Sequence, residues 1–310
     1  MNRWQKQAVN YRLKSEKQVM NDLKKVYSDA LKNVRAKISE LMQYPNMQSK
    51  IYQLKYQRVL ESQIEAILDK LNTNQYETIE QYLKDCYEDG FIGTLYSMQG
   101  QGVPILFPID QKQVLQSIYL DSKISKNLYT KLGIDIKNLK KTIRDEISRG
   151  VASGIGYAEI SKSIGRKMGI GAANAVRIAR TEGGRIQSES AFDAMKKAKA
   201  AGADVVKQWD STLDGKTRPH HRELDGQIRE IDEPFEVAGR KAMAPHHFGV
   251  ASEDINCRCC LLERARWALG DDFDKMDNES KTIIHDIKAD TYEDFKKQYY
   301  EVLDGNQGKS

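Results

Sequence analysis

The chain has 310 residues, of which 40% are hydrophobic and 30% are charged, with only six prolines. This balance excludes a disordered or fibrous chain, and the length predicts two structural units in a helix-rich protein. The net charge of +5 is unevenly distributed, because residues 1–60 carry 13 basic and 4 acidic side chains, whereas residues 270–310 carry 6 and 11. A basic front and an acidic tail are typical of a protein that meets a polyanion at one end.

The apolar stretches of the chain are short and interrupted by polar residues, so we expect no membrane span. The basic N-terminal segment lacks the apolar core of a secretory signal. Three of the four cysteines, Cys257, Cys259 and Cys260, are too close in sequence to link distant loops, which argues against a disulfide framework. We therefore expect the protein to fold in a cytoplasm.

The first 100 residues carry three apolar stripes with the spacing of a helix face. The stripes cover residues 23–41, 51–71 and 76–87. Pro45 should end the first helix, and Asn74 with Glu77 has the spacing of a capping box that opens the third. We expect residues 1–100 to form an N-terminal helical bundle or arm.

A Gly/Pro-rich segment around residues 100–108 predicts a loop or hinge, and helical spacing resumes after it, so residues 101–149 should form a helical connector. Helical patterns continue over residues 157–168 and 172–199. We expect the last helix to bend at Gly183-Gly184, because paired glycines weaken a helix interior.

The sequence pattern changes after Gly202. Residues 205–209 predict a strand, and the segment through Arg258 is rich in loops. Residues 266–310 form an acidic tail with helical stretches. The predicted fold class is α+β, with a predominantly α-helical N-terminal region, a small loop-rich α+β module and a helical acidic tail.

Four short motifs occur in order in the second half of the chain. They are Ala179-Arg180-Thr181-Glu182, Trp209-Asp210, the segment from Thr217 to Gly226 that contains Leu224-Asp225-Gly226, and Asn256-Cys257-Arg258-Cys259. Together they resemble the MuF-type domain of phage minor head (head-morphogenesis) proteins, whose pattern is an ARTE helix, a strand ending in tryptophan, TRxxHxxLDG and NCRC. The resemblance covers residues 150–265, and His221, four residues before Asp225, is the matching histidine.

This resemblance implies a minor capsid protein that binds the phage portal protein, lies inside the head near the portal after assembly in the host cytoplasm, and acts in DNA packaging, retention or ejection. Scaffold or major capsid protein are further candidate partners. Some members of the family carry an enzymatic domain after the NCRC motif. Only about 50 residues follow Cys259 here, so we expect none in this chain.

We expect the motif residues to be structural and the protein not to be an enzyme. These residues are Arg180, Glu182, Trp209, Asp210, Arg218, His221, Leu224, Asp225, Gly226, Asn256, Cys257 and Cys259. Arg180 and Glu182, two positions apart on a helix, point to different sides, so each needs a partner elsewhere. Asp210, Asp214 and Arg218 are the candidates, in a paired network beside Trp209.

Zinc is an alternative for the same module, since His221, Cys257 and Cys259 are plausible Zn²⁺ ligands and a small loop-rich unit gains from a metal. The fourth ligand would be His220, His246, His247 or Cys260. The C-x-C-C spacing argues against zinc, because structural sites usually separate their cysteines by two to four residues. We therefore expect no cofactor, with zinc as the minority alternative.

Two rival functions remain open. One rival is an enzyme. It could be a cysteine enzyme, with His221 and Cys257 or Cys259 as a thiolate pair, or a metal-dependent nuclease, with His220 or His221, Asp210 and Asn256 at the metal. No catalytic motif supports either possibility. The other rival is sequence-independent binding of double-stranded DNA through phosphates. The candidate DNA contacts are Lys24, Lys25, Lys32, Arg35, Lys37, Lys140 and Lys141. We expect the helical region to supply the protein-partner contact.

Overall fold

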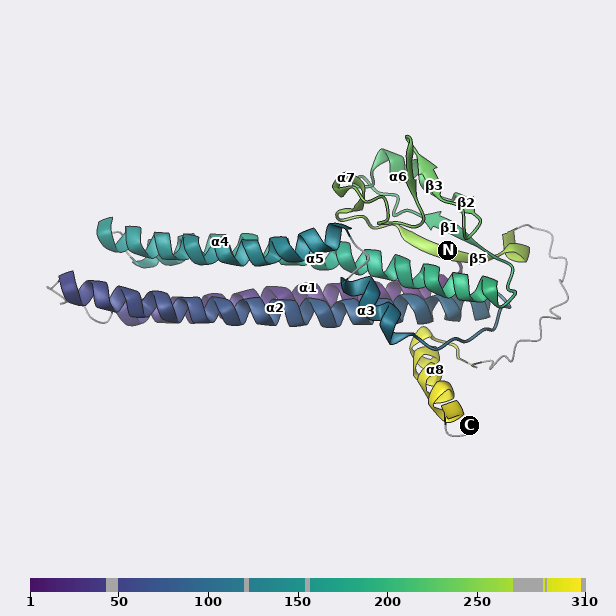
Figure 1. The fold of residues 1–310 in the computed structure, drawn as a ribbon, viewed down its shortest axis with the longest axis horizontal. Coiled ribbons are helices and arrows are strands. Elements are labelled where there is room, and N and C mark those ends of the chain that lie inside the picture. The colour runs from purple at the N-terminus through teal and green to yellow at the C-terminus, as the bar shows by residue number, and fades with distance from the viewer. Residues whose placement is uncertain (43–49, 120–122, 154–156, 270–286, 288, 308–310) are drawn as a thin grey trace. The chain divides into compact units, whose positions relative to one another are not determined.

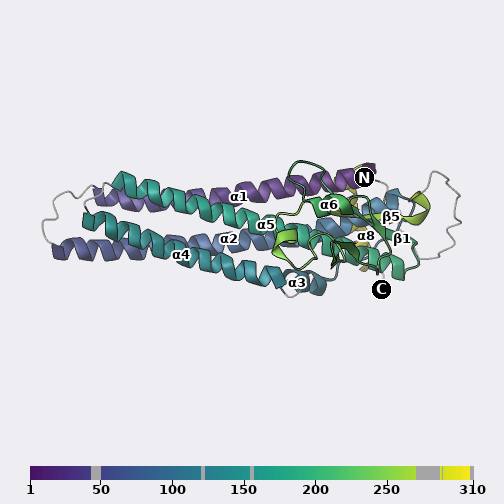
Figure 2. The same ribbon diagram turned by 90° about the horizontal axis from the view of Figure 1, so that it is seen from above.

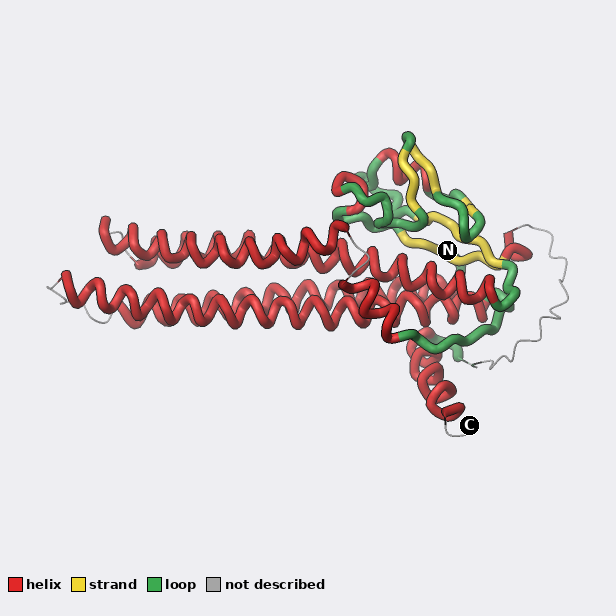
Figure 3. Tube along the Cα trace, in the orientation of Figure 1, coloured by secondary structure: helices red, strands yellow, loops and turns green. Residues whose placement is uncertain are grey.

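The protein is described by a computed structural model that covers residues 1–42, 50–119, 123–153, 157–269, 287 and 289–307 (Figure 1). The helices are α1 (Arg3–Met42), α2 (Lys50–Gly100), α3 (Gln111–Tyr119), α4 (Lys123–Ser153), α5 (Tyr157–Ala200), α6 (Pro219–Leu224), α7 (Ala251–Asp254), the 3-10 helix η1 (Arg266–Leu269) and α8 (Tyr292–Gln307). The strands are β1 (Val205–Asp210), β2 (Ile228–Arg229), β3 (Phe235–Val237), β4 (Arg240–Ala242) and β5 (Cys260–Ala265). Helices dominate and the strands are few and short, which confirms the predicted fold class (Figure 3).

The chain divides into two compact units. We call one the helical unit, which consists of Lys17–Gln81 and Ser125–Ala179, and the other the module unit, which consists of Met1–Glu16, Tyr82–Ile124 and Arg180–Ser310. Helices α1, α2 and α5 each contribute residues to both units, so neither unit is one continuous segment of sequence.

The helical unit consists of segments of α1, α2, α4 and α5 that lie side by side (Figures 1 and 2). Their apolar stripes face inward, and side chains such as Leu23, Leu68 and Ile164 are fully buried. This is the packing expected of amphipathic helices that bury one face in a bundle.

The capping-box prediction at Asn74 is wrong, because α2 continues through it. Leu71, Gln75 and Ile79 follow one another at four-residue steps and are all buried, so the stripe crosses the expected break. Gln75 is satisfied there by the Tyr27 hydroxyl, which donates to its Oε1 at 2.7 Å. Burial of a continuous face outweighs a local capping signal.

The module unit is built on a three-stranded antiparallel sheet of order β2-β1-β5, with β3 and β4 as a separate hairpin. The C-terminal part of α5 packs beside this sheet (Figure 1), since Phe192 and Met195 belong to the same buried cluster as Trp209 and Leu261. The strand expected at 205–209 is thereby confirmed as β1.

Helix α8 is anchored to the module unit by aromatic side chains. Tyr292, Phe295 and Tyr299 are buried. The Tyr292 hydroxyl lies 3.2 Å from the carbonyl oxygen of Asp89, whose carboxylate also pairs with Lys296 at 2.5 Å. The rest of the expected acidic tail falls largely on residues 270–286, outside the described residues. Among the helices that are described, none is both long enough and apolar enough to cross a bilayer.

Candidate functional site

The LDG motif ties the end of β1 to helix α6. Leu224 is fully buried in the core of the module unit. The Asp225 carboxylate accepts a hydrogen bond from the Ser211 backbone N–H at 2.7 Å. Gly226 has φ +77°, a conformation that favours glycine, and its N–H donates to the carbonyl oxygen of Trp209 at 2.9 Å. The motif therefore fixes α6 against the strand that ends in tryptophan.

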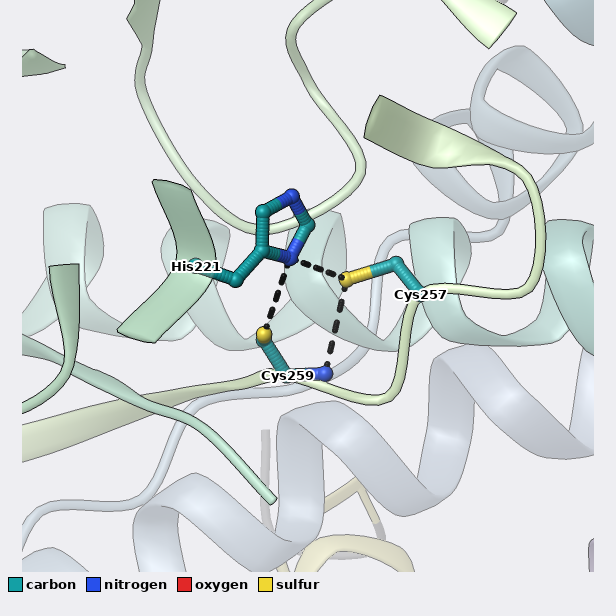
Figure 4. Close-up of side chains that lie close together, drawn as sticks. All are labelled: His221, Cys257 and Cys259. Carbon is teal, nitrogen blue, oxygen red and sulfur yellow. Dashed lines mark hydrogen bonds between the residues drawn. The ribbon is translucent and has the colours of Figure 1, made fainter. Parts of the chain in front are cut away.

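Helix α6 and the segment before β5 bring three sulfur and nitrogen donors together (Figure 4). His221 Nδ1 lies 3.3 Å from Cys259 Sγ and 3.5 Å from Cys257 Sγ. The backbone N–H of Cys259 points at the Cys257 sulfur at 3.4 Å. All three residues are buried, with exposed fractions of 2%, 4% and 6% for His221, Cys257 and Cys259. The sequence alternative of a His–Cys–Cys group is thus a real cluster in space.

A chain of hydrogen bonds holds this cluster from the β1 side. The Ser211 hydroxyl lies 3.3 Å from Cys259 Sγ, donates to the carbonyl oxygen of His221 at 2.6 Å and accepts from Trp209 Nε1 at 3.1 Å. The Trp209 ring itself packs edge-on against the imidazole. The tryptophan at the end of β1 therefore orients the histidine as well as filling the core.

A buried carboxylate holds the cluster from the opposite side. Glu253 on α7 places its Oε2 3.1 Å from His221 Nε2, and its other oxygen contacts His220 and Arg240. Burial alone would raise the pKa of Glu253, but the hydrogen bond with His220 and the interactions with His221 and Arg240 outweigh it and lower the pKa. Glu253 is thus an ionised acceptor for the far edge of the imidazole.

The two thiols lie close enough to shift the pKa values of one another in opposite directions. Interaction with the Cys257 thiol, assisted by His221 and Ser211, lowers the pKa of Cys259, and interaction with Cys259 together with burial raises the pKa of Cys257. These shifts favour the thiolate at Cys259 over the thiolate at Cys257, since hydrogen bonding to the charged form stabilises it.

The remaining candidates for a fourth ligand face other partners. His220 Nδ1 lies 3.4 Å from Glu253, His247 Nε2 lies 3.2 Å from Glu189, the Cys260 sulfur accepts a hydrogen bond from Arg12 at 3.4 Å, and the His246 ring packs over Gly184. Within the ranges that the structure covers, the group of close metal-ligating atoms holds His221, Cys257 and Cys259 alone.

The described contacts of the charged motif residues are with partners other than those expected beside Trp209. Arg180 Nε donates to Glu16 at 2.7 Å, and Arg185 Nε donates to Glu182 at 3.0 Å. Arg218 donates to the carbonyl oxygen of Ile255 at 2.6 Å.

The other acidic candidates are also placed elsewhere. Asp214 forms a two-bond pair with Arg258, which lowers the pKa of Asp214. Asp210 is half-buried at the end of β1, opposite Cys260 in the sheet. The ARTE and NCRC motifs meet instead through Thr181, whose hydroxyl accepts the backbone N–H of Asn256 at 3.1 Å. Asn256 has φ +55°.

Sequence reasoning missed Ser211 and Glu253, which contact the cluster directly. Ser211 immediately follows the Trp209-Asp210 motif, and Glu253 lies in the acidic segment before NCRC. Both residues lie beside recognised motifs, but neither has a spacing that would mark it as a functional residue.

The candidate DNA contacts lie in the helical unit. Three are engaged in ion pairs, namely Lys32 with Asp29, Lys37 with Glu40 and Lys140 with Asp69. Lys24, Lys25, Arg35 and Lys141 are exposed. Lys24, Lys25 and Lys141 form no ion pair with the carboxylates that the structure describes, so they are the better candidates.

The family comparison coincides with the motif-bearing region. Residues 141–262 match the family model described as Phage Mu protein F like protein. This segment of the chain therefore carries a Phage Mu protein F-like domain, in agreement with the resemblance of its motifs. The matched segment starts nine residues before the expected 150–265 and includes every motif described above, from Arg180 to Cys259.

Two curated relatives extend the similarity beyond this segment. The minor head protein GP7 of Bacillus phage SPP1 is 28% identical over 249 residues, which are 77% of this chain and 80% of that protein. A protein of Enterococcus faecalis (strain ATCC 700802 / V583) named NAD(+)--arginine ADP-ribosyltransferase EFV is 30% identical over 266 residues. That match covers 85% of this chain but only 55% of the relative's length. No solved structure matches the chain.

Proposed function

We propose that this Mu F-like chain is incorporated in the virion as a minor head protein that binds the portal inside the head and acts in head assembly and in DNA packaging, retention or ejection. Assembly would take place in the host cytoplasm, with scaffold or major capsid protein as further partners. The observation that carries the proposal is the 28% identity with a minor head protein over 80% of that protein's length.

We assign the partner contact to the helical unit. It exposes Val59, Ile134 and Ile170, which are 56%, 49% and 60% exposed and, like the exposed apolar side chains of the module unit, are available to a partner. Exposed apolar residues on amphipathic helices are the usual anchors for a protein partner. The module unit, by contrast, has its motif residues committed to internal bonds.

Co-purification with the portal protein tests this assignment. The full chain should be retained by tagged portal and be present in mature heads. Ile170→Asp should reduce the retained chain roughly tenfold, because burying a large aliphatic side chain is worth about 1.5–3 kcal/mol. Leu213→Asp is the matched control, since Leu213 is equally exposed, at 60%, but lies in the module unit.

Two outcomes would contradict the proposal. Loss of portal binding with Leu213→Asp but not with Ile170→Asp would reverse the assignment of the contact. Absence of the chain from mature heads would remove the virion role altogether.

The similarity to an ADP-ribosyltransferase favours a second candidate function, which we do not adopt. The match leaves 45% of that relative uncovered, since it spans 55% of it. The His–Cys–Cys cluster is also almost entirely buried, so a substrate has no direct access to it. We infer that the chain acts by binding. Transfer of labelled ADP-ribose from NAD⁺ to an arginine acceptor by the purified chain would overturn this inference.

A further inference from the structure

We propose that His221 Nδ1, Cys257 Sγ and Cys259 Sγ bind a single zinc ion in the module unit. The two nitrogen–sulfur distances, 3.3 and 3.5 Å, are close to the edge of a coordination tetrahedron. Ordinary Zn–S and Zn–N lengths give that edge as roughly 3.6 Å. The three ligand atoms all lie within 4.8 Å of one another, so they are grouped closely enough to hold a single ion.

The orientation of His221 supports this site independently of the cysteines. Its Nε2 faces the Glu253 carboxylate at 3.1 Å. A proton on Nε2 that is donated to the carboxylate leaves the Nδ1 lone pair directed at the two sulfurs. Zinc-bound histidines usually show this pattern, in which the second ring nitrogen donates to a carboxylate.

The local backbone allows both cysteines to face the histidine despite their short C-x-C spacing. Asn256 has a left-handed conformation just before the pair, and Arg258 between the cysteines turns outward to bond Asp214. Both sulfurs consequently lie near the histidine, at 3.5 and 3.3 Å from His221 Nδ1 for Cys257 and Cys259. The backbone N–H of Cys259 also points to the Cys257 sulfur at 3.4 Å.

The ligand types select zinc over other common cations. Two sulfurs and one imidazole disfavour Mg²⁺ and Ca²⁺, which prefer oxygen. Cys260 belongs to the opposite face of β5 and bonds Arg12, and the Ser211 hydroxyl is engaged with His221 and Trp209. Among the described residues the ion therefore has three protein ligands, and its fourth position is left to a small exogenous ligand.

Metal analysis of the full chain tests the proposal. The chain, purified without a histidine tag, should contain about one zinc ion per molecule by elemental mass spectrometry. After chelation, added Co²⁺ should produce the near-ultraviolet thiolate-to-cobalt absorption band. Cys257→Ser and Cys259→Ser should each lose the bound zinc. Cys260→Ser, which alters an adjacent buried thiol outside the cluster, should retain it.

A second variant separates a ligand site from general damage to the fold. Glu253→Gln should keep the cobalt band but weaken zinc affinity about 10- to 100-fold, the usual effect of losing a carboxylate behind a zinc-bound histidine. Glu236→Gln, at an exposed carboxylate paired with Lys241, should leave the affinity unchanged.

The proposal would be overturned by a folded wild-type chain that contains no zinc and gives no cobalt band. A disulfide between Cys257 and Cys259 in protein isolated without added oxidant would overturn it as well. Neither result would affect portal binding. Failure of the zinc proposal can therefore be distinguished from failure of the proposed function.

Discussion

Glu263 places a carboxyl group in the interior of the module unit. Its side chain is 3% exposed, and Gln5 Nε2 donates to it at 3.2 Å. Burial raises the pKa of Glu263 to about 7, because the charged form is poorly solvated there. A carboxyl group at this position favours the folded state only while it is protonated.

The pH dependence of stability follows from that shift. The pKa of Glu263 is higher in the folded than in the unfolded chain, so its contribution is fully present below pH 4.5 and is lost as pH rises through about 7. The loss should be on the order of 3 kcal/mol. Urea denaturation between pH 4.5 and 8 should show this decline in wild type and a flatter profile in Glu263→Gln. Parallel profiles would contradict the prediction.

The partners of individual side chains are the part of the structure that the sequence predicts least. Trp209, His221 and the two cysteines of NCRC were identifiable because motif order marks them. The partner of Arg180 was not, because Glu16 lies 164 positions away and no local spacing points to it. When a charged residue has several possible partners, the fold decides which of them it contacts, and its neighbours in sequence do not.

At the element scale, α5 contains glycines with opposite roles. A Cβ at Gly184 would lie 2.4 Å from Nε2 of the His246 ring, whereas one at Gly169 would meet nothing within 4 Å. α5 runs as one helix through the glycine pair 183–184, where Gly183 faces the Tyr82 ring and Gly184 faces the His246 ring.

Two alanine substitutions test this distinction within one helix. Gly184→Ala should destabilise the chain by about 1–3 kcal/mol, because the clash with a buried ring outweighs the better helix propensity. Gly169→Ala should be neutral or stabilise by up to about 1 kcal/mol. Denaturation midpoints of the full-length variants measure both, and equal shifts of the same sign would refute the packing role of Gly184.

Element types were more predictable than element ends. Helical periodicity located α1, α2 and α5, and the run of β-branched residues located β1. The continuity of α2 across Asn74 was not predictable, since a capping box is only a local signal. It is decided by the buried face formed by Leu71, Gln75 and Ile79, and the polar member of that face depends on a hydrogen bond from Tyr27 on another helix.

At the scale of the whole molecule, the charge asymmetry predicts weak binding to duplex DNA through phosphates. Fluorescence anisotropy should give the same affinity for unrelated sequences and a steep fall with salt. Replacing Lys24, Lys25 and Lys141 together by Gln should lower the salt-dependence slope by up to about 3, since each phosphate contact contributes roughly 0.9.

A matched triple variant provides the control for DNA binding. Lys32, Lys37 and Lys140 already pair with carboxylates, so their replacement by Gln should change the slope less. Binding that is equal at low and high salt, or that depends on sequence, would contradict a phosphate-only contact.

The antiparallel pairing of β1 with β5 brings together the two ends of the segment that holds the His–Cys–Cys cluster. Val205 and Ala265 are direct neighbours in the ladder, so the chain enters and leaves the His–Cys–Cys segment at adjoining points. A segment whose ends adjoin can be exchanged, enlarged or transplanted as one cassette without lengthening the path between the helices that flank it. The pairing therefore permits the same small module to be carried by chains of very different length.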